Sequence, residues 1–239
     1  MDIPILFEDA ELLVINKPPG VVVNNAESVK GETVQDWAEK KSTNLQIYKS
    51  TNEYEEFVSR AGIVHRIDKE TSGILLIAKT PESFIELQRQ FKERIVKKTY
   101  LAIVHGDVVP EEGEIRAPVG RLPWNREHFG IVPGGKEAIT RYKKIKNLQL
   151  RIKNENTETV SLVEVYPETG RTHHIRVHFK YINHPLLGDY LYAGRKTSRN
   201  DRKEGGRVLL HAWKISFLHP KTGEPLAIEA PIPDDMNIN

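Results

Sequence analysis

Residues 65–73 read His65-Arg66-Ile67-Asp68-Lys69-Glu70-Thr71-Ser72-Gly73, and an apolar segment, residues 74–78, follows directly. This stretch predicts a turn that leads into a buried strand, because a Thr-Ser-Gly sequence precedes a continuous apolar run. It also sets one carboxylate, Asp68, among basic neighbours on a loop at a strand edge. Such a position suits a nucleophile or an acid–base group, since loops carry chemistry and adjacent strands hold it in place. Taken alone, however, the pattern is typical of an aspartate that only caps its own turn.

Further segments accompany this stretch in a fixed order. Besides Ser59-Arg60-Ala61-Gly62-Ile63-Val64 directly before it, they are Ile15-Asn16-Lys17-Pro18-Pro19-Gly20, Lys98-Thr99-Tyr100-Leu101-Ala102, Gly170-Arg171-Thr172-His173-His174-Ile175-Arg176-Val177-His178, His184-Pro185-Leu186-Leu187-Gly188-Asp189 and Leu209-Leu210-His211-Ala212. Together they resemble the motifs of the RluA-type pseudouridine synthases, which isomerise uridine in ribosomal or transfer RNA. The resemblance covers most of residues 3–230. Its pieces stand in the family's order, which leaves little room for a chance match.

The resemblance implies an RNA pseudouridine synthase with three catalytic residues. Asp68 matches the catalytic carboxylate, Tyr100 the tyrosine that packs against the target base, and Arg176 the basic residue that pairs with the carboxylate. An opposite charge nearby keeps such a carboxylate ionised. Substrate contacts carry over by position to His65, Arg66, Thr71, Arg171, His174 and Leu210, the last as an apolar wall of the pocket.

The implied reaction breaks the bond from ribose to the base nitrogen and joins the ribose to a ring carbon of the same uracil. No oxidation occurs and no group is transferred in, so neither a cofactor nor a metal is expected. A uridine in folded RNA must first be turned out of its stack, which costs about a few kcal/mol. Arg66 matches the family residue that fills the vacated place. Whether Asp68 adds to the ring, attacks the ribose or assists elimination through a glycal stays open.

Length and composition set broader limits. The chain has 239 residues, 38% of them apolar, and no cysteine, which excludes disulfides, thiolate catalysis and cysteine-ligated metals. No apolar run approaches the length of a membrane span, and the N-terminus lacks the pattern of a secretory signal. We therefore expect a cytoplasmic protein. We expect one catalytic domain over residues 1–239 without a separate N-terminal RNA-binding domain, and a monomer.

The positive charge of the chain is concentrated in one region. Residues 170–207 hold nine Lys or Arg and three Asp or Glu, whereas the whole chain carries a net charge of only +2. A one-sided basic region is the electrostatic footprint expected for a phosphate backbone. A solvated loop with incidental charge would give the same composition.

The pattern of apolar residues predicts an α+β fold with a mixed, mainly antiparallel central sheet and flanking helices and loops. Strands are expected at residues 5–7, 12–16, 21–23, 74–78, 98–104, 138–145, 148–152, 160–165, 208–217 and 226–228. Helices are expected from Thr33 to Lys40 and from Pro81 onward. Residues 42–57 read as an exposed loop, and residues 122–135 and 195–206 as mobile, arginine-bearing segments. A hairpin connection is an equally good interpretation of residues 122–135.

A helix is also predicted for the segment that carries Arg176, with Thr172 as its N-cap and residue 183 as its stop. It would place His174 and His178 one turn apart, which is a spacing that metal ligands use. No neighbouring acid or cysteine supplies a third ligand at an established spacing. We therefore expect histidines that are packed and hydrogen-bonded, or that touch phosphate.

Two other functions remain as alternatives. The chain could be a non-catalytic RNA-binding module, which the joint presence of Asp68, Tyr100 and Arg176 disfavours. A hydrolase that uses Asp68 with His65 is more remote, because no serine or cysteine nucleophile motif is present. The chain departs from the family pattern at Ile67, at His174 and at residue 24, where Asn stands in place of a frequent histidine; the last two could alter RNA contacts.

Overall fold

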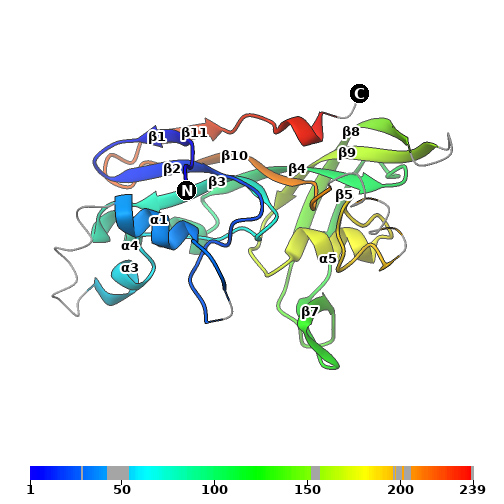
Figure 1. Ribbon diagram of the computed structural model, residues 1–239, viewed down its shortest axis with the longest axis horizontal. Helices are drawn as coiled ribbons and strands as arrows, with labels where there is room; N and C mark the ends of the chain where they lie inside the picture. Colours follow the sequence, from blue (N-terminus) through cyan, green and yellow to red (C-terminus); the bar gives the residue numbers. More distant parts are fainter. Residues whose placement is uncertain are drawn as a thin grey trace. The chain divides into compact units, whose positions relative to one another are not determined.

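The computed structural model describes residues 1–27, 29–41, 54–151, 157–195, 197, 201 and 206–237. The chain divides into two compact units (Figure 1), and each is described by itself. Unit 1 comprises Met1–Lys98 and Ala212–Pro231, and unit 2 comprises Thr99–His211 and Ile232–Asn239.

The strands of unit 1 are neighbours in the order β1 (Ile5–Glu8), β2 (Leu12–Lys17), β3 (Ser72–Ala78), β10 (Leu210–Leu218) and β11 (Pro225–Glu229). The first two residues of β10 belong to unit 2. The pairs β1–β2, β2–β3 and β10–β11 are antiparallel. Every residue of β3 is buried, as the continuous apolar run after the Thr-Ser-Gly turn predicts.

Three helices of unit 1 lie on one face of these strands in Figure 1: α1 (Val34–Lys41), α3 (Glu55–Ser59) and α4 (Pro81–Lys92). The predicted cap of α1 is confirmed, because the hydroxyl of Thr33 accepts the amide hydrogen of Asp36 at 3.1 Å. Thr80 caps α4 in the same way, by accepting from the amide of Ser83 at 3.2 Å. The buried side chains include Trp37 in α1 and Phe84 and Leu87 in α4, whereas Phe91, expected on the same apolar face of α4, is only partly buried.

Unit 2 contains an antiparallel group of strands in the order β4 (Lys97–His105), β9 (Thr157–Pro167), β8 (Ile139–Arg151) and β5 (Glu112–Arg116). A separate antiparallel hairpin, β6 (Val119–Leu122) and β7 (Asn125–Ile131), extends from it (Figure 1). The unit also holds α5 (His174–Tyr181) and the short 3-10 helix η2 (Asp234–Met236).

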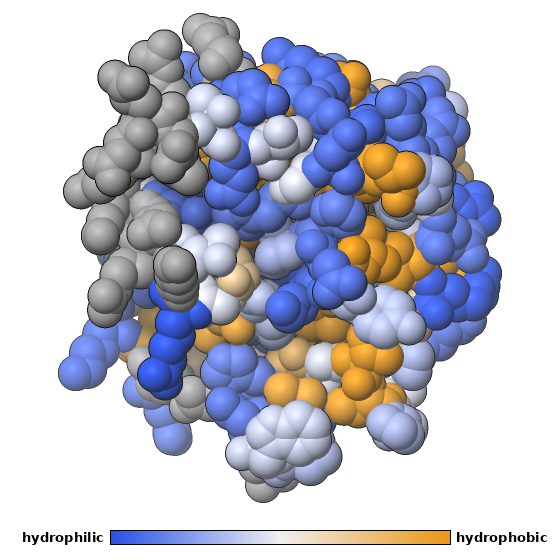
Figure 2. All heavy atoms as spheres, turned by 90° about the vertical axis from the view of Figure 1, so that its right-hand side faces the viewer, coloured by the Kyte–Doolittle hydropathy of each residue, from blue (hydrophilic) through white to orange (hydrophobic). Residues whose placement is uncertain are grey.

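The face drawn in Figure 2 is mostly hydrophilic, with smaller apolar areas between the polar side chains. Among the described large apolar residues of unit 2, Trp124 in the turn between β6 and β7 is the most exposed, at 79%. No helix in the described part of the chain is both long and apolar enough to cross a membrane.

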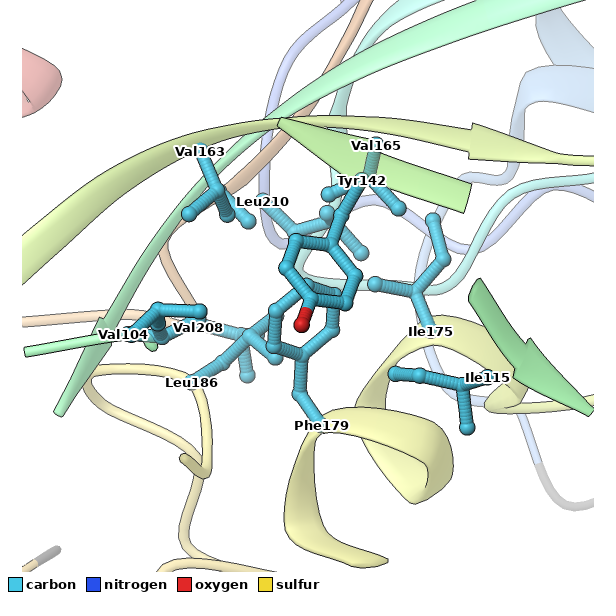
Figure 3. Close-up of a cluster of buried hydrophobic side chains, with 12 residues drawn as sticks. Val104, Ile115, Tyr142, Val163, Val165, Ile175, Phe179, Leu186, Val208 and Leu210 are labelled. Carbon is cyan, nitrogen blue, oxygen red and sulfur yellow. The ribbon is translucent and has the colours of Figure 1, made fainter. Parts of the chain in front are cut away.

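The core of unit 2 forms where α5 packs on the strands (Figure 3). The ring of Phe179 from α5 faces that of Tyr142 from β8, with centroids 5.6 Å apart. Ile175, one turn earlier on the helix, and Leu210 at the start of β10 lie in the same cluster. Ile175 and Phe179 thus form an apolar stripe on α5 that anchors the helix to the core.

Of the two predicted ends of α5, the structure confirms one and corrects the other. At the C-terminal end, His184 donates its amide hydrogen to the carbonyl of Phe179 at 2.8 Å and Asn183 donates to Lys180 at 3.1 Å. With Asn183 at a φ of 64°, this is a Schellman motif, and the predicted stop is confirmed. The predicted N-cap at Thr172 is wrong: His173 occupies that position, in the left-handed conformation and without a side-chain cap bond.

Four other expectations about the elements need correction. Residues 21–23 are not a strand, because the carbonyls of Val22 and Val23 accept the first amide hydrogens of α1 instead. Of the expected loop 42–57, residues 42–53 lie outside the described part, and the last residues form α3, with Phe57 buried. The two strands expected over residues 138–152 are one strand, β8, with an irregularity in its pairing between Lys144 and Lys146.

Residues 122–135 form mainly a hairpin rather than a mobile loop, as one of the two interpretations had it. Most of the segment 195–206 lies outside the described residues. The α+β class with a mainly antiparallel sheet is confirmed.

Candidate active site

The Asp68 turn spans residues 68–71 in unit 1 and leads directly into β3. The carbonyl of Asp68 accepts the amide hydrogen of Thr71 at 3.1 Å, which closes a four-residue turn. Asp68 remains partly exposed and Arg66 is exposed, whereas Thr71 is buried at 1% exposure. The hydroxyl oxygen of Thr71 is buried without a hydrogen-bond partner in the described structure. The turn thus leaves Asp68 partly exposed, while its far end continues into the buried strand β3.

A buried lysine ties this turn to the end of β2. The Nζ of Lys17, whose side chain is fully buried, donates to the carbonyls of Pro18, Val21 and Lys69 at 2.8, 3.0 and 3.1 Å. The carbonyl of Lys69 also accepts the amide hydrogen of Gly20 at 2.8 Å. Because three carbonyl dipoles surround the ammonium group, its burial is compensated. The Lys-Pro-Pro-Gly motif therefore holds the residue that follows Asp68.

Gly73 is required at the start of β3 by its neighbour. It has a φ of +108°, and a Cβ built there would lie 2.2 Å from the carbonyl oxygen of Ala212 in β10. Only glycine permits both this backbone conformation and this close approach. The glycine of the Thr-Ser-Gly sequence is thereby explained by packing in unit 1.

His65 anchors the segment before the turn. Its Nε2 accepts the amide hydrogen of Leu76 at 3.0 Å, and its ring lies 4.7 Å from that of Phe91, centroid to centroid. Burial, together with the positive charges of Lys98 and Arg60, lowers the pKa of His65 from 6.5 to about 3. The imidazole is therefore neutral and carries its hydrogen on Nδ1. Burial also lowers the pKa of Lys98, to about 8.

In unit 2, Tyr100 and Leu210 are brought together at the core. Tyr100 lies on β4 opposite Val165 of β9, is partly buried, and packs against the hydrophobic cluster of the unit. Leu210 belongs to that cluster and is 4% exposed, so core packing is at least part of its role. Arg171, also predicted to contact substrate, donates from Nε to the carbonyl of Glu137 at 3.1 Å.

Arg176 lies on α5 and is buried, with 5% exposure. Its Nε and one terminal nitrogen donate to the two carboxylate oxygens of Asp189 at 2.7 and 2.8 Å. Its guanidinium carbon lies 5.1 Å from the centre of the Tyr192 ring. The predicted pairing of Arg176 with Asp68 stays a prediction.

His174 and His178 are packed side chains, as expected. The hydroxyl of Thr140 lies 3.1 Å from Nε2 of His174 and 2.9 Å from Nδ1 of His178. The remaining nitrogens lie 3.0 Å from the carbonyls of Thr169 and Ala117 respectively. Burial lowers the pKa of His178. The described residues hold no group of three or more potential ligands that could bind a metal.

Comparison with known proteins matches the part of the chain that contains these candidate residues. The family model described as RNA pseudouridylate synthase matches residues 11–181, a span that contains Asp68, Tyr100 and Arg176. The chain belongs to this family. A ribosomal large subunit pseudouridine synthase D of Neisseria meningitidis is 40% identical, over 99% of this chain and 60% of the relative. An uncharacterized RNA pseudouridine synthase of Bacillus subtilis is 39% identical, over 99% of this chain and 71% of that protein.

Solved structures of pseudouridylate synthases share the fold. The human RNA pseudouridylate synthase domain containing 1 matches with a TM-score of 0.70 at 24% identity, over 96% of this chain and 83% of its own. The human RNA pseudouridylate synthase domain containing 4 matches with a TM-score of 0.68 at 23% identity, over 97% and 89%. At this identity the solved structures establish the fold alone, and the family resemblance is confirmed by the family model and by the curated relatives.

Two structural residues, Lys17 and Asp189, receive no role from the sequence motifs. Both lie in motifs that carry the family resemblance. A lysine that ends an apolar strand before a Pro-Pro-Gly turn is a signal for a buried cation, since all residues of that strand except Asn16 are buried. No comparable local signal marks Asp189, whose partner lies on another element.

Proposed function

We propose that the chain isomerises specific uridines of RNA to pseudouridine, with Asp68 as the catalytic carboxylate. The observation that carries the proposal is the family match over residues 11–181, within which Asp68 occupies a partly exposed turn in front of a buried strand. The chain spans 60% of the length of the Neisseria relative. Its activity, substrate and partners are therefore part of this proposal.

The reaction needs no atom from outside the substrate except exchangeable protons. The bond between C1′ of the ribose and N1 of uracil breaks, and a bond forms between C1′ and C5. The hydrogen on C5 leaves as a proton, and N1 gains one. In this proposal Asp68 acts on the ring or on the ribose, Tyr100 packs against the base and assists proton transfer, and Arg176 keeps the carboxylate ionised.

These three residues are described in different units: Asp68 in unit 1, and Tyr100 and Arg176 in unit 2. That they serve one reaction is part of the proposal, as is the expectation of a single catalytic domain. The remaining predicted contacts differ in character. Arg66 is exposed and suits an RNA contact, whereas both ring nitrogens of His174 lie within hydrogen-bonding distance of Thr140 and Thr169, which favours a positioning role for that side chain.

RNA contacts are further supported by the β6–β7 hairpin. Trp124 is 79% exposed in its turn, and the guanidinium carbon of Arg121 lies 5.4 Å from the centre of the Phe129 ring. Exposed aromatic rings beside arginine stack on unpaired bases, and each stacked base contributes about 1–3 kcal/mol. We therefore expect Trp124→Ala to weaken RNA binding about tenfold with unchanged thermal stability. Filter binding at increasing salt concentrations measures the two affinities. Equal affinities of the wild type and Trp124→Ala would exclude a contribution of Trp124 to RNA binding.

The target proposed first is ribosomal RNA. Relatives named ribosomal large subunit pseudouridine synthase D occur in several bacteria at 38–40% identity. Transfer RNA remains the second candidate. We further propose that the chain acts as a monomer in the cytoplasm, without a bound cofactor or metal.

The two alternative functions fare differently. A non-catalytic RNA-binding module would have the same fold. Substitution of Asp68 distinguishes the two functions, because a pure binding module would keep its function without this carboxylate. The hydrolase hypothesis has less support. Nε2 of His65 already accepts the amide hydrogen of Leu76, and the pKa of His65, about 3, is too low for a general base.

The experiment that tests the proposal is pseudouridine mapping on total RNA from cells with and without the gene. A uridine that loses its modification on deletion, regains it with the wild-type gene and stays unmodified with Asp68→Ala would support the enzyme and identify the substrate. Recovery of modification with Asp68→Ala would exclude Asp68 as the catalytic group. No changed site in any RNA would favour the binding module.

A further inference from the structure

Asp189 is a fully buried carboxylate whose hydrogen-bonding capacity is directed at one side chain and one turn. Its exposure is 0%, and Oδ1 accepts the amide hydrogens of Leu191 at 3.1 Å and Tyr192 at 3.3 Å. The same oxygen accepts from a terminal nitrogen of Arg176, while Oδ2 accepts from Nε. A buried charge is tolerated when it is paired and hydrogen-bonded in this way.

Main-chain groups around Asp189 also help to fix its position. Gly188, directly before it, has a φ of +77°, and a Cβ there would lie 1.9 Å from the carbonyl oxygen of Arg207. The carbonyl of Asp189 accepts the amide hydrogen of Ala193 at 2.9 Å, which closes the turn that follows. The side chain of Asp189 is therefore oriented in part by main-chain contacts.

The pairing determines the orientation of the guanidinium group. Because Nε and one terminal nitrogen are held by two oxygens of one carboxylate, the guanidinium plane is fixed and the direction of its other terminal nitrogen with it. The guanidinium carbon also lies over the ring of Tyr192, 5.1 Å from its centre. Arg176 itself is carried by α5, whose apolar stripe anchors the helix in the core of unit 2.

We propose that Asp189 is a positioning residue for pseudouridine formation, which acts by holding the guanidinium of Arg176 in the orientation that the reaction requires. This inference rests on the proposed function and on the assigned role of Arg176. It predicts that loss of the Asp189 charge slows the chemical step on bound RNA and leaves the binding of RNA largely intact. A misplacement of about 1 Å in such a group costs about 100-fold in rate.

The test uses the full chain and total RNA labelled with tritium at C5 of uracil, from cells in which the gene is deleted. Each pseudouridine formed releases the tritium from C5, so single-turnover release measures the chemical step. We expect Asp189→Asn to lower the single-turnover rate by about 100-fold and to change the half-saturating RNA concentration by less than about threefold.

A double variant separates positioning from general loss of structure. If Asp189 acts through Arg176, adding Asp189→Asn to Arg176→Lys should lower the rate by less than about threefold further, because the two residues act as a unit. Val163→Ala, which destabilises the same core from β9, serves as the matched folding control. Its folded fraction should turn over at the wild-type rate.

The outcomes are distinguishable. A wild-type chain that releases no tritium overturns the proposed function, and the role of Asp189 with it. An active wild type whose Asp189→Asn variant is equally fast, or whose losses in the double variant simply multiply, overturns only the positioning role. A rate loss in Val163→Ala as large as that in Asp189→Asn would also overturn it, because destabilisation would then account for both.

Discussion

The Asp68 turn in unit 1 is held through main-chain groups, whereas the guanidinium of Arg176 in unit 2 is held by another side chain. Around Asp68, the carbonyl of Lys69 is fixed by Lys17 and Gly20, and the strand behind it approaches β10 as closely as a glycine permits. Around Arg176, two oxygens of Asp189 and the ring of Tyr192 define the geometry.

This difference has consequences for which substitutions each region tolerates. A turn held through its main chain is sensitive to backbone conformation and to the volume of neighbouring Cβ atoms. A guanidinium held by a carboxylate is sensitive to charge, since a buried ion left without its partner is strongly destabilising. The two regions should therefore fail through different kinds of mutation.

The largest effect is expected from Asp68→Asn, which removes the charge and keeps the shape of the side chain. The rate of pseudouridine formation should fall by about a thousandfold or more, because no other group supplies the carboxylate. Asp68 is partly exposed, so the melting temperature should change little. Single-turnover tritium release and thermal melts measure the two quantities. Substantial residual turnover would contradict the assignment.

Gly73→Ala tests the main-chain packing behind the turn. We expect a loss of about 3–5 kcal/mol in unfolding free energy, from strain at a φ of +108° and from the approach to Ala212. Gly31→Ala is the matched control, since Gly31 has a φ of +98° and nothing within 4 Å of the added Cβ. It should cost about 1–2 kcal/mol. Equal losses in denaturant titrations would show that the contact with β10 contributes nothing.

Lys17→Met tests the link between the end of β2 and the Asp68 turn. Three carbonyls lose a charged donor, so we expect a loss of about 2–3 kcal/mol in unfolding free energy. The rate on bound RNA should fall as well, because the carbonyl next to Asp68 is no longer fixed. Lys97→Met, at an exposed position, is the control and should stay within about 0.5 kcal/mol of wild type. A Lys17→Met variant as stable as this control would disprove the link.

The smallest effect is expected from pH. The folded-state pKa of His65 is about 3, below its usual 6.5, so the unfolded chain takes up the proton first as the pH falls. Stability is therefore fully present above about pH 6.5 and is lost progressively toward pH 3. Between pH 7 and pH 5 the wild type should lose about 1–2 kcal/mol more than His65→Gln. Parallel pH dependences of the two proteins would argue against a neutral His65.

Much of the fold could be predicted because its signals are local. The burial of β3 follows from an uninterrupted apolar run, and the capping bonds of Thr33 and the stop at Asn183 follow from residue types at helix ends. The expected strand at residues 21–23 failed for a tertiary reason, since its carbonyls are taken by α1. The N-cap at Thr172 failed because His173 adopts a left-handed conformation that its residue type does not predict.

The family, the class of fold and the residues proposed for chemistry could be predicted from the sequence, because motifs and apolar periodicity lie within short segments. The groups that hold those residues became visible only in the folded chain. Lys17 reaches a carbonyl 52 residues away, Gly73 meets the backbone of Ala212, and Arg176 meets Asp189 on a separate turn. Such contacts depend on which elements fold against each other, and the strength of a buried ion pair depends on burial that no local pattern encodes.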